Sequence, residues 1–257
     1  YLKQSYLLTS RWLLDRIDES TLDDNTRSKC TFYTKQYIDA ISPSNFALTN
    51  PDVIRETIES KGQNLIRGLK NLTEDMKKGR ISMTDESAFE IGKNLATTAG
   101  SVVFQNEMMQ LIHYRPLTEQ VNELPLLIVP PCINKYYILD LKEENSFVRY
   151  ALEQGNNVFV ISWHNPDETM GDRCWDEYLE HGTIKAIDVA RKITGAKKVN
   201  AVSWCIGGTM LATTMAVLAA KRRKPVASAT FFTTLLDFSD PGELKVFIDE
   251  SQVRQHE

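Results

Sequence analysis

The chain has 257 residues, of which 42% are hydrophobic and 25% are charged, a composition typical of a globular protein. Its 30 basic and 34 acidic residues leave a net charge of −4, without the basic excess of nucleic-acid-binding proteins. No apolar run approaches the ~18 residues that cross a bilayer, and the first residues lack the pattern of a secretion signal. We therefore expect a cytoplasmic protein with no membrane span and no nucleic-acid partner.

The four cysteines are far apart in the sequence and form no CxxC or paired Cys/His pattern. This spacing predicts free thiols and no metal site, and no motif indicates a bound cofactor. The chain does not start with Met, and it stops soon after an apolar stretch typical of a buried strand. We therefore expect it to be part of a longer protein.

Residues 1–118 are predicted to form a mainly helical N-terminal domain. The clearest helix lies over residues 50–80, where Asn50 can cap the first turn and Pro51 occupies the first helical position. Gly62 and Gly68 weaken this helix or mark a break. An apolar stripe at helical spacing follows from Ile54, Ile58, Leu65, Leu69, Leu72 and Met76. Residues 89–116 show no strong period.

The pattern changes near residue 116, and residues 119–257 are predicted to begin an α/β domain. Short apolar runs typical of buried parallel strands occur at residues 125–131, 157–162, 198–203 and 226–234. They alternate with helical patterns at residues 144–155, 176–195 and 207–221. Alternating strands and helices predict right-handed crossovers and an open parallel sheet, which carries its chemistry at the carboxyl ends of the strands.

The stretch SWCIGG places Cys205 directly after a predicted strand and directly before a predicted helix. A nucleophile elbow needs small residues two positions before and after its nucleophile, and here these are Ser203 and Gly207. A helix N-terminus favours the thiolate form of cysteine, which is the reactive form. The backbone N–H of Ile206 would point at a developing oxyanion. We therefore predict that Cys205 is a nucleophile.

The same stretch allows two other interpretations. A lone cysteine is most often an inert buried apolar residue. A glycine-rich phosphate loop is disfavoured because the chain has no GxGxxG here and no lysine after Gly208.

Seven stretches along the chain resemble the polyhydroxyalkanoate synthases, in particular the class I enzymes that make poly-3-hydroxybutyrate. They occur in family order and cover nearly all of the chain after about residue 35: DAISPSNFALTNP, GKNLATTAGSVVFQNE, LIHYRPLTEQV, PLLIVPPCINKYYILDL, GNNVFVISWHNPD, SWCIGGTM and LLDFSDPGELKVFIDE. The resemblance implies a helical N-terminal domain followed by the first part of an α/β-hydrolase catalytic domain.

The resemblance also implies an activity. Cys205 matches the family nucleophile, which attacks the thioester of an (R)-3-hydroxyacyl-CoA, releases CoA and passes the acyl group to a growing polyester. The loop after the first core strand would supply the second oxyanion N–H, for which we name Ile133. Asn134 and Tyr136 would line the substrate entry, although loop residues of these types also serve in turns and packing.

The chain departs from the family pattern in two ways. Ser203 stands where the family usually has glycine. The acid and the histidine of this fold follow the nucleophile, but after Cys205 the sequence offers few candidates, and we assign none of them to the triad. These candidates are Asp237, Asp240, Asp249 and His256. We expect the acid and base beyond residue 257, so this chain alone would be nearly inactive.

Other residues near the predicted site are expected to have structural roles. His164 precedes the nucleophile at a position where the family usually has arginine, which indicates a surface or loop-anchoring role. His113 and His181 are expected to be structural histidines. Cys132 is expected to be an inert wall residue.

Two alternative functions remain open at this stage. The chain could belong to a thioesterase-like hydrolase with a cysteine nucleophile, which would form no polymer. Alternatively, its helices could be a non-catalytic module that binds the granule surface or a partner. The resemblance implies a homodimer associated with polyester granules and does not identify the preferred monomer length.

Overall fold

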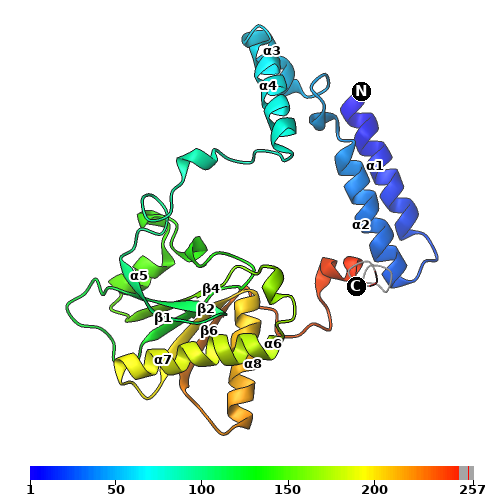
Figure 1. Ribbon diagram of the computed structural model, residues 1–257. Coiled ribbons are helices and arrows are strands. Elements are labelled where there is room, and N and C mark those ends of the chain that lie inside the picture. Colours follow the sequence, from blue (N-terminus) through cyan, green and yellow to red (C-terminus); the bar gives the residue numbers. More distant parts are fainter. Residues whose placement is uncertain (249–253, 255–257) are drawn as a thin grey trace. The chain divides into compact units, whose positions relative to one another are not determined.

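The computed structural model describes residues 1–248 and residue 254, so Asp249 and His256 lie outside the described residues. The chain divides into two compact units (Figure 1). One contains Tyr1–Thr84 and the segment that starts at Ser239, and the other contains Asp85–Phe238. The sequence-based domain boundary at residue 118 stays a prediction.

The first unit is helical. Among residues 1–84 its α-helices are α1 (Leu2–Asp18), α2 (Asp24–Ala40), α3 (Pro51–Glu59) and α4 (Gln63–Lys78). Short 3-10 turns occur at Pro43–Asn45 and Gly242–Phe247. The connection between α1 and α2 is held by the Arg27 guanidinium, which donates hydrogen bonds to backbone carbonyls of Ile17, Asp18, Ser20 and Leu22.

The helix predicted over residues 50–80 is two helices. The Asn50 side chain caps α3 by accepting from the N–H groups of Asp52 and Val53, as the sequence predicts. The chain then breaks before α4, where Gly62 has a φ of 85°. Glycine adopts this left-handed conformation without the steric cost that a Cβ brings. Gly68, in contrast, lies inside α4.

The second unit contains one six-stranded sheet, with the strand order β1-β2-β4-β3-β5-β6. The strands are β1 (Gly100–Gln105), β2 (Met109–Tyr114), β3 (Leu126–Val129), β4 (Val158–Trp163), β5 (Val199–Trp204) and β6 (Val226–Phe232). β3, β4, β5 and β6 run parallel, which confirms the four strands and the α/β fold predicted from the sequence.

Two strands of this sheet were not predicted. β1 and β2 pair antiparallel with each other, and β2 pairs antiparallel with β4, so the sheet is mixed. They lie in the stretch for which the sequence shows no clear period. β1 is the edge strand and is largely exposed, and a bulge between Val102 and Phe104 interrupts its alternation. The local sequence pattern therefore does not indicate a strand at β1.

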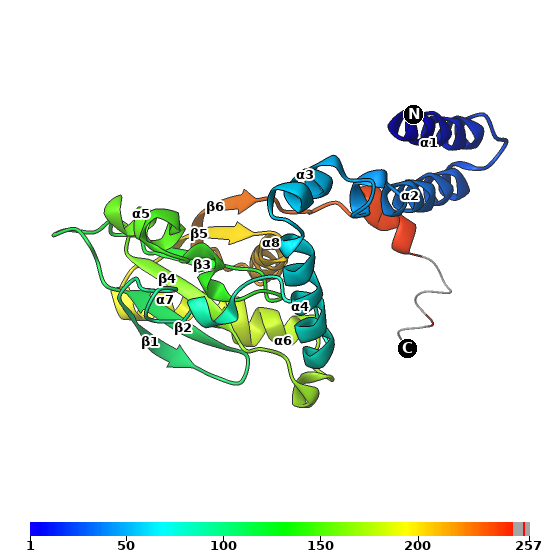
Figure 2. The ribbon, with the colours of Figure 1, turned by 90° about the horizontal axis from the view of Figure 1, so that it is seen from above.

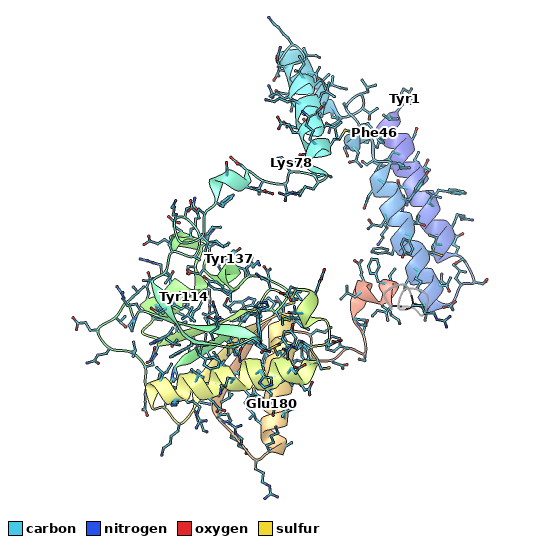
Figure 3. All side chains as sticks on the ribbon, viewed as in Figure 1. Tyr1, Phe46, Lys78, Tyr114, Tyr137 and Glu180 are labelled. Carbon is cyan, nitrogen blue, oxygen red and sulfur yellow. The ribbon has the colours of Figure 1, made fainter. Side chains whose placement is uncertain are left out.

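Helices cover both faces of the sheet (Figure 2). On one face α7 (Lys185–Thr194) and α8 (Ile206–Ala220) bury apolar side chains against β3, β4 and β5. On the other face α5 (Phe147–Glu153) packs against β3 and β4. Tyr137 and Glu180 lie on opposite sides of the sheet (Figure 3). Short 3-10 turns complete the unit at Glu86–Ala88, Tyr136–Leu139, Glu143–Asn145 and Glu168–Met170.

The helical stretch that leads into α7 is irregular. It starts with the short α6 (Trp175–Glu177), continues as a π-helix at Tyr178–Ile184 and then becomes α7. A π-helical turn widens the backbone and frequently occurs at functional sites. Within the described part of the chain, no helix combines the length and the apolarity that crossing a bilayer requires.

Candidate active site

Cys205 lies at the turn between β5 and α8, at the carboxyl edge of the parallel strands. Its side chain is exposed, and its backbone has a φ of 49° and a ψ of −127°. A non-glycine residue reaches this region only under strain, and such strain is concentrated at functional sites. The strand, the sharp turn and the helix predicted around Cys205 are therefore confirmed as structure.

The two glycines after Cys205 let the helix start against the sheet. A Cβ on Gly207 would lie 2.5 Å from the Val129 carbonyl oxygen and 2.7 Å from that of Pro130. A Cβ on Gly208 would overlap the side chain of Thr234. Both positions therefore exclude a side chain, which brings the N-terminus of α8 beside the end of β3.

Ser203, the departure from the family glycine, is fully buried in β5. Its hydroxyl donates a hydrogen bond to the Thr230 carbonyl oxygen of β6 at 3.3 Å. The side-chain oxygen is thus occupied between two strands, and the turn at Cys205 forms with serine at this position.

Ile206, the predicted oxyanion donor, is the first residue of α8. N–H groups in the first turn of an α-helix have no partner within the helix, and they point out of its N-terminus. The position agrees with that of a donor next to Cys205. The role itself stays a prediction.

The loop after β3 carries the other predicted site residues. A turn runs from Pro131 to Asn134, closed by a hydrogen bond from the Asn134 N–H to the Pro131 carbonyl oxygen at 3.3 Å. The Ile133 side chain is 81% exposed, and the Asn134 side chain is exposed. Tyr136 is half-buried and packs against the apolar cluster around α5. The structure brings these residues to the carboxyl edge of β3, and their roles stay predictions.

Cys132 lies in the same loop and is half-buried against the apolar cluster around α7 and α8. Burial raises the pKa of the Cys132 thiol, and the nearby Cys205 raises it further. A raised pKa keeps the thiol protonated and unreactive at neutral pH. This is consistent with the inert role expected for Cys132.

An aromatic cluster adjoins Cys205 that the sequence analysis did not identify. Trp204 stacks on Phe232 with ring centroids 4.3 Å apart, and Phe147 meets the Trp204 ring edge-on at 4.7 Å. The three residues come from β5, β6 and α5, so only the pairing of distant segments brings them together. The cluster includes Trp204, the residue that directly precedes Cys205 in the chain.

A second unpredicted feature lies under the loop after β3. The Trp163 indole N–H, at the end of β4, donates a buried hydrogen bond to the Pro130 carbonyl oxygen at 2.9 Å. The sequence does not indicate this bond, because residues 33 positions apart in the chain show no local signal of contact.

His113 contacts other side chains of the sheet, whereas His164 lies at the surface. His113 Nε2 is 2.6 Å from the Asn157 Oδ1 atom, and its ring stacks on Phe159. His164 is exposed, with Nε2 3.8 Å from the Asp167 carboxylate. These contacts agree with the structural and surface roles expected for these two residues.

An open polar cleft of about 790 Å³ lies away from the turn at Cys205. It is lined by Gln105, Asn106, Glu107, His164, Asp167, Thr169, Met170 and Arg173. Its Arg173 is neutralised by Glu107 and Glu177. We assign the chemistry to Cys205 instead, because none of the residues that line the cleft has the positive φ that holds the Cys205 thiol at its turn. Nowhere in residues 1–248 do three His, Cys, Asp or Glu side chains converge in the manner of metal ligands.

Comparison with solved structures finds α/β hydrolases. One is a mutant of an α/β hydrolase enzyme from the metagenome of Lake Arreo, Spain, with 17% sequence identity and a TM-score of 0.44. The match covers 68% of this chain and 61% of that chain.

Comparison with known sequences is more specific. Residues 1–151 match the family model described as the N-terminus of poly-beta-hydroxybutyrate polymerase (PhaC), and residues 125–256 match that of the alpha/beta hydrolase fold. The chain is 52% identical to the poly(3-hydroxyalkanoate) polymerase subunit PhaC of Cupriavidus necator, over 98% of this chain and 43% of that protein. It is 45% identical to the subunit of the same name from Rhizobium meliloti, over 100% of this chain and 43% of that protein. The chain thus spans less than half the length of these relatives, and it belongs to the poly-beta-hydroxybutyrate polymerase (PhaC) family.

Proposed function

We propose that these residues are the first part of a poly(3-hydroxyalkanoate) polymerase subunit, an acyltransferase that joins (R)-3-hydroxyacyl groups from CoA thioesters into a polyester. The observation that carries this proposal is the exposed thiol of Cys205, held at a positive φ between β5 and α8. The names of the relatives support the same activity.

In the proposed reaction the Cys205 thiolate attacks the carbonyl carbon of the acyl-CoA. A new C–S bond forms, the carbonyl oxygen becomes an oxyanion, and the bond to the CoA sulfur breaks, so CoA leaves as a thiol after it takes up a proton. The hydroxyl of a second monomer or of the chain end then attacks the acyl-Cys205 thioester. That step forms an oxygen ester and breaks the C–S bond to Cys205, and the proton of the attacking hydroxyl passes to the Cys205 sulfur.

A thiol suits this sequence of steps better than a hydroxyl would. Transfer from the CoA sulfur to the Cys205 sulfur exchanges one thioester for another, so the acyl group remains activated. Formation of the oxygen ester in the second step is then downhill. Serine would reach an oxygen ester in the first step and lose that driving force.

The oxyanion would be stabilised by two backbone N–H groups. The Ile206 N–H, in the first turn of α8, is the first donor. The second comes from the loop after β3, where we retain Ile133. Preorganised donors of this kind are worth about 10²- to 10³-fold in kcat each.

The general base is assigned to no residue of this chain. The relatives are more than twice as long as the match, and we place the base histidine and its acid in the part that the chain does not span. A cysteine nucleophile without its base loses most of its activation, so this chain alone should be nearly inactive.

The test measures CoA-thiol release from (R)-3-hydroxybutyryl-CoA by the complete subunit and by its Cys205→Ala variant. Cys174→Ala is the matched control, because it removes another exposed thiol of the same unit. We expect release and insoluble polymer from the wild type and the control, and neither from Cys205→Ala. Undiminished release by Cys205→Ala would reject Cys205 as the nucleophile. Release without polymer in the wild type would favour the hydrolase alternative.

A specific observation supports granule binding as a further property of the subunit. α4 carries an exposed apolar stripe formed by Leu65, Leu69, Leu72 and Met76. A helix with one apolar and one charged face buries the apolar face against another surface. We propose the polyester granule as that surface, since the relatives are named for a polyester product.

Replacing part of this stripe tests the proposal. Leu69→Gln with Leu72→Gln should lower the fraction of the complete subunit that sediments with granules, and leave CoA release from the dissolved substrate unchanged. Lys70→Gln on the same helix is the control. Equal sedimentation of the double variant and the control would argue against α4 as the contact. Homodimerisation and a cytoplasmic location stay predictions.

A further inference from the structure

A buried hydrogen bond joins the Trp163 side chain to the backbone of Pro130. Trp163 is the last residue of β4 and is only 7% exposed. Its indole N–H donates to the Pro130 carbonyl oxygen at 2.9 Å in a buried environment. A buried carbonyl without a donor is costly, so this bond strongly favours one position of the Pro130 peptide.

The same carbonyl lies against the nucleophile turn. Pro130 directly follows β3, and Val129 of β3 pairs with Ser203 of β5, two residues before Cys205. Gly207 packs so closely on the Pro130 peptide that a Cβ would lie 2.7 Å from its oxygen. The Pro130 carbonyl is therefore held between the Trp163 indole on one side and the start of α8 on another.

The Trp163 ring is itself held in place by the π-helix. A Cβ on Gly182 would lie 2.5 Å from Cζ3 and 2.6 Å from Cη2 of the Trp163 ring, so the ring rests directly on that glycine. Tyr178, from the start of the same π-helix, lies 5.7 Å away between ring centroids. Packing against the π-helix thus holds the Trp163 ring in the orientation in which its indole N–H donates to Pro130.

The loop beyond Pro130 has few backbone hydrogen bonds to hold it. Pro130 and Pro131 have no N–H to donate. The turn from Pro131 to Asn134 is closed by a bond of 3.3 Å, at the long end of the usual range. The Trp163 indole is therefore a polar contact that fixes the loop at the point where it leaves β3.

We propose that Trp163 is a positioning residue for acyl transfer. Its indole N–H fixes the Pro130 peptide, and through it the loop from Pro131 to Asn134 that presents the second oxyanion donor to Cys205. This inference rests on the proposed function, because it concerns the oxyanion that forms when a thioester is attacked. Small displacements of a preorganised donor weaken stabilisation of the transition state more than substrate binding.

The test removes the N–H and keeps the ring. In the complete subunit, Trp163→Phe removes the donor with a modest loss of volume. Site-specific replacement of Trp163 by benzothienylalanine keeps the bicyclic shape and removes only the N–H, so it supplies the measurement even where Trp163→Phe does not fold. Trp175→Phe, which alters an exposed tryptophan of the same unit, is the control.

Two reactions of Cys205 separate positioning from general damage. Acyl transfer from (R)-3-hydroxybutyryl-CoA passes through an oxyanion. Alkylation by iodoacetamide displaces iodide at a saturated carbon and forms no oxyanion there. We expect the N–H-deficient variants to lose roughly 10-fold in kcat for acyl transfer, below the cost of deleting a donor outright. Their KM and the alkylation rate of Cys205 should stay within about twofold of the control.

Each outcome decides the proposal. Selective loss of acyl transfer supports positioning by Trp163. Equal loss in both reactions would overturn it in favour of a structural role for the turn, and unchanged acyl transfer would overturn it outright. These results are distinct from failure of the proposed function, in which Cys205→Ala itself would retain CoA release.

Discussion

The Cys205 N–H donates a hydrogen bond to the carbonyl oxygen of Phe232, the last residue of β6, at 3.0 Å. This bond ties the strained turn to the neighbouring strand just where the pairing of β5 with β6 ends. The strain at Cys205 is therefore offset by sheet pairing on one side and by the start of α8 on the other. The thiol remains exposed on a rigid support.

Backbone strain at Cys205 should lower the free energy of unfolding, so its relief should stabilise the protein. We expect Cys205→Gly to unfold at a higher temperature than Cys205→Ala, with a difference of about 1 kcal/mol, because glycine adopts the φ of 49° without a Cβ clash. Thermal unfolding of the two variants of the complete subunit, both without the thiol, gives the comparison. An equal or lower midpoint for the glycine variant would contradict backbone strain at this position.

Because Gly208 and Thr234 lie so close together, we expect a change at Thr234 to restore stability that a larger residue at position 208 removes. Gly208→Ala should destabilise the protein by about 1–3 kcal/mol, because its Cβ would overlap the Thr234 side chain. Since the nearest atoms all belong to that side chain, adding Thr234→Gly should recover part of the loss. Gly68→Ala is the control, because a Cβ there meets nothing within 4 Å. Chemical denaturation of the wild type, Gly208→Ala, Thr234→Gly and the double variant measures the coupling between the two positions. Strictly additive effects on the free energy of unfolding would argue against direct contact.

A buried polar network supports the segment on the α5 side of the sheet. Asp140 is 1% exposed, and its Oδ1 accepts hydrogen bonds from the hydroxyls of Thr98 at 2.5 Å and Ser146 at 2.6 Å. The Ser146 hydroxyl also caps α5 by accepting from the Arg149 N–H. We expect Ser146→Ala to cost about 2 kcal/mol, since it removes a helix cap and a buried bond.

The matched control for this network is Ser228→Ala, which changes an exposed serine whose hydroxyl bonds to Asn200. Its effect on the free energy of unfolding should stay within about 0.5 kcal/mol. Similar losses for the two serine variants in urea titrations would show that the Asp140 network contributes little.

The pKa of Cys132 leads to a pH prediction. Burial raises this pKa above its ordinary value of 9.0, and only the thiolate reacts with iodoacetamide. In a Cys205→Ala background, the labelling rate of Cys132 should therefore keep rising above about pH 10, where a thiol with the ordinary pKa of 9.0 is almost fully ionised and its rate levels off. Mass spectrometry of the labelled peptide across pH 7–11 checks this, with the exposed Cys174 as reference. A plateau of Cys132 labelling at or below about pH 10 would contradict a pKa raised by burial.

The same shift has a consequence for stability, with a definite sign. Between the ordinary pKa and the raised value, the unfolded chain loses the Cys132 proton while the folded protein keeps it. The unfolded state then binds fewer protons, so the free energy of unfolding falls as the pH rises through this window. Cys132→Ala should remove this part of the decline.

Several elements could be predicted because their causes are local. β3 and β4 are continuous apolar runs, since parallel strands inside the sheet are covered on both faces. The start of α3 depends on a cap and a proline that are adjacent in the sequence. The turn at Cys205 was recognisable because its small neighbours lie within three residues of it.

Other features depend on partners that no local pattern reveals. β2 is a strand because it pairs with β4, and β1 is a strand because it pairs with β2. β1 lies at an exposed edge, where hydrophobic alternation is weak. The break between α3 and α4 depended on which of two glycines the chain would use, and only Gly62 takes the left-handed conformation. Both cases were decided by long-range packing and by backbone conformation.

The sequence by itself determined the α/β architecture, the location of the thiol and membership of a polymerase family. These follow from burial patterns and short motifs, which involve residues close together in the sequence. Only the tertiary structure decided how that thiol is surrounded. The bond from Trp163 to Pro130, the close approach of the indole ring to Gly182 and the stacking of Trp204 on Phe232 join residues far apart in the chain. Such contacts depend on strand order and register, which follow from the packing of the whole sheet.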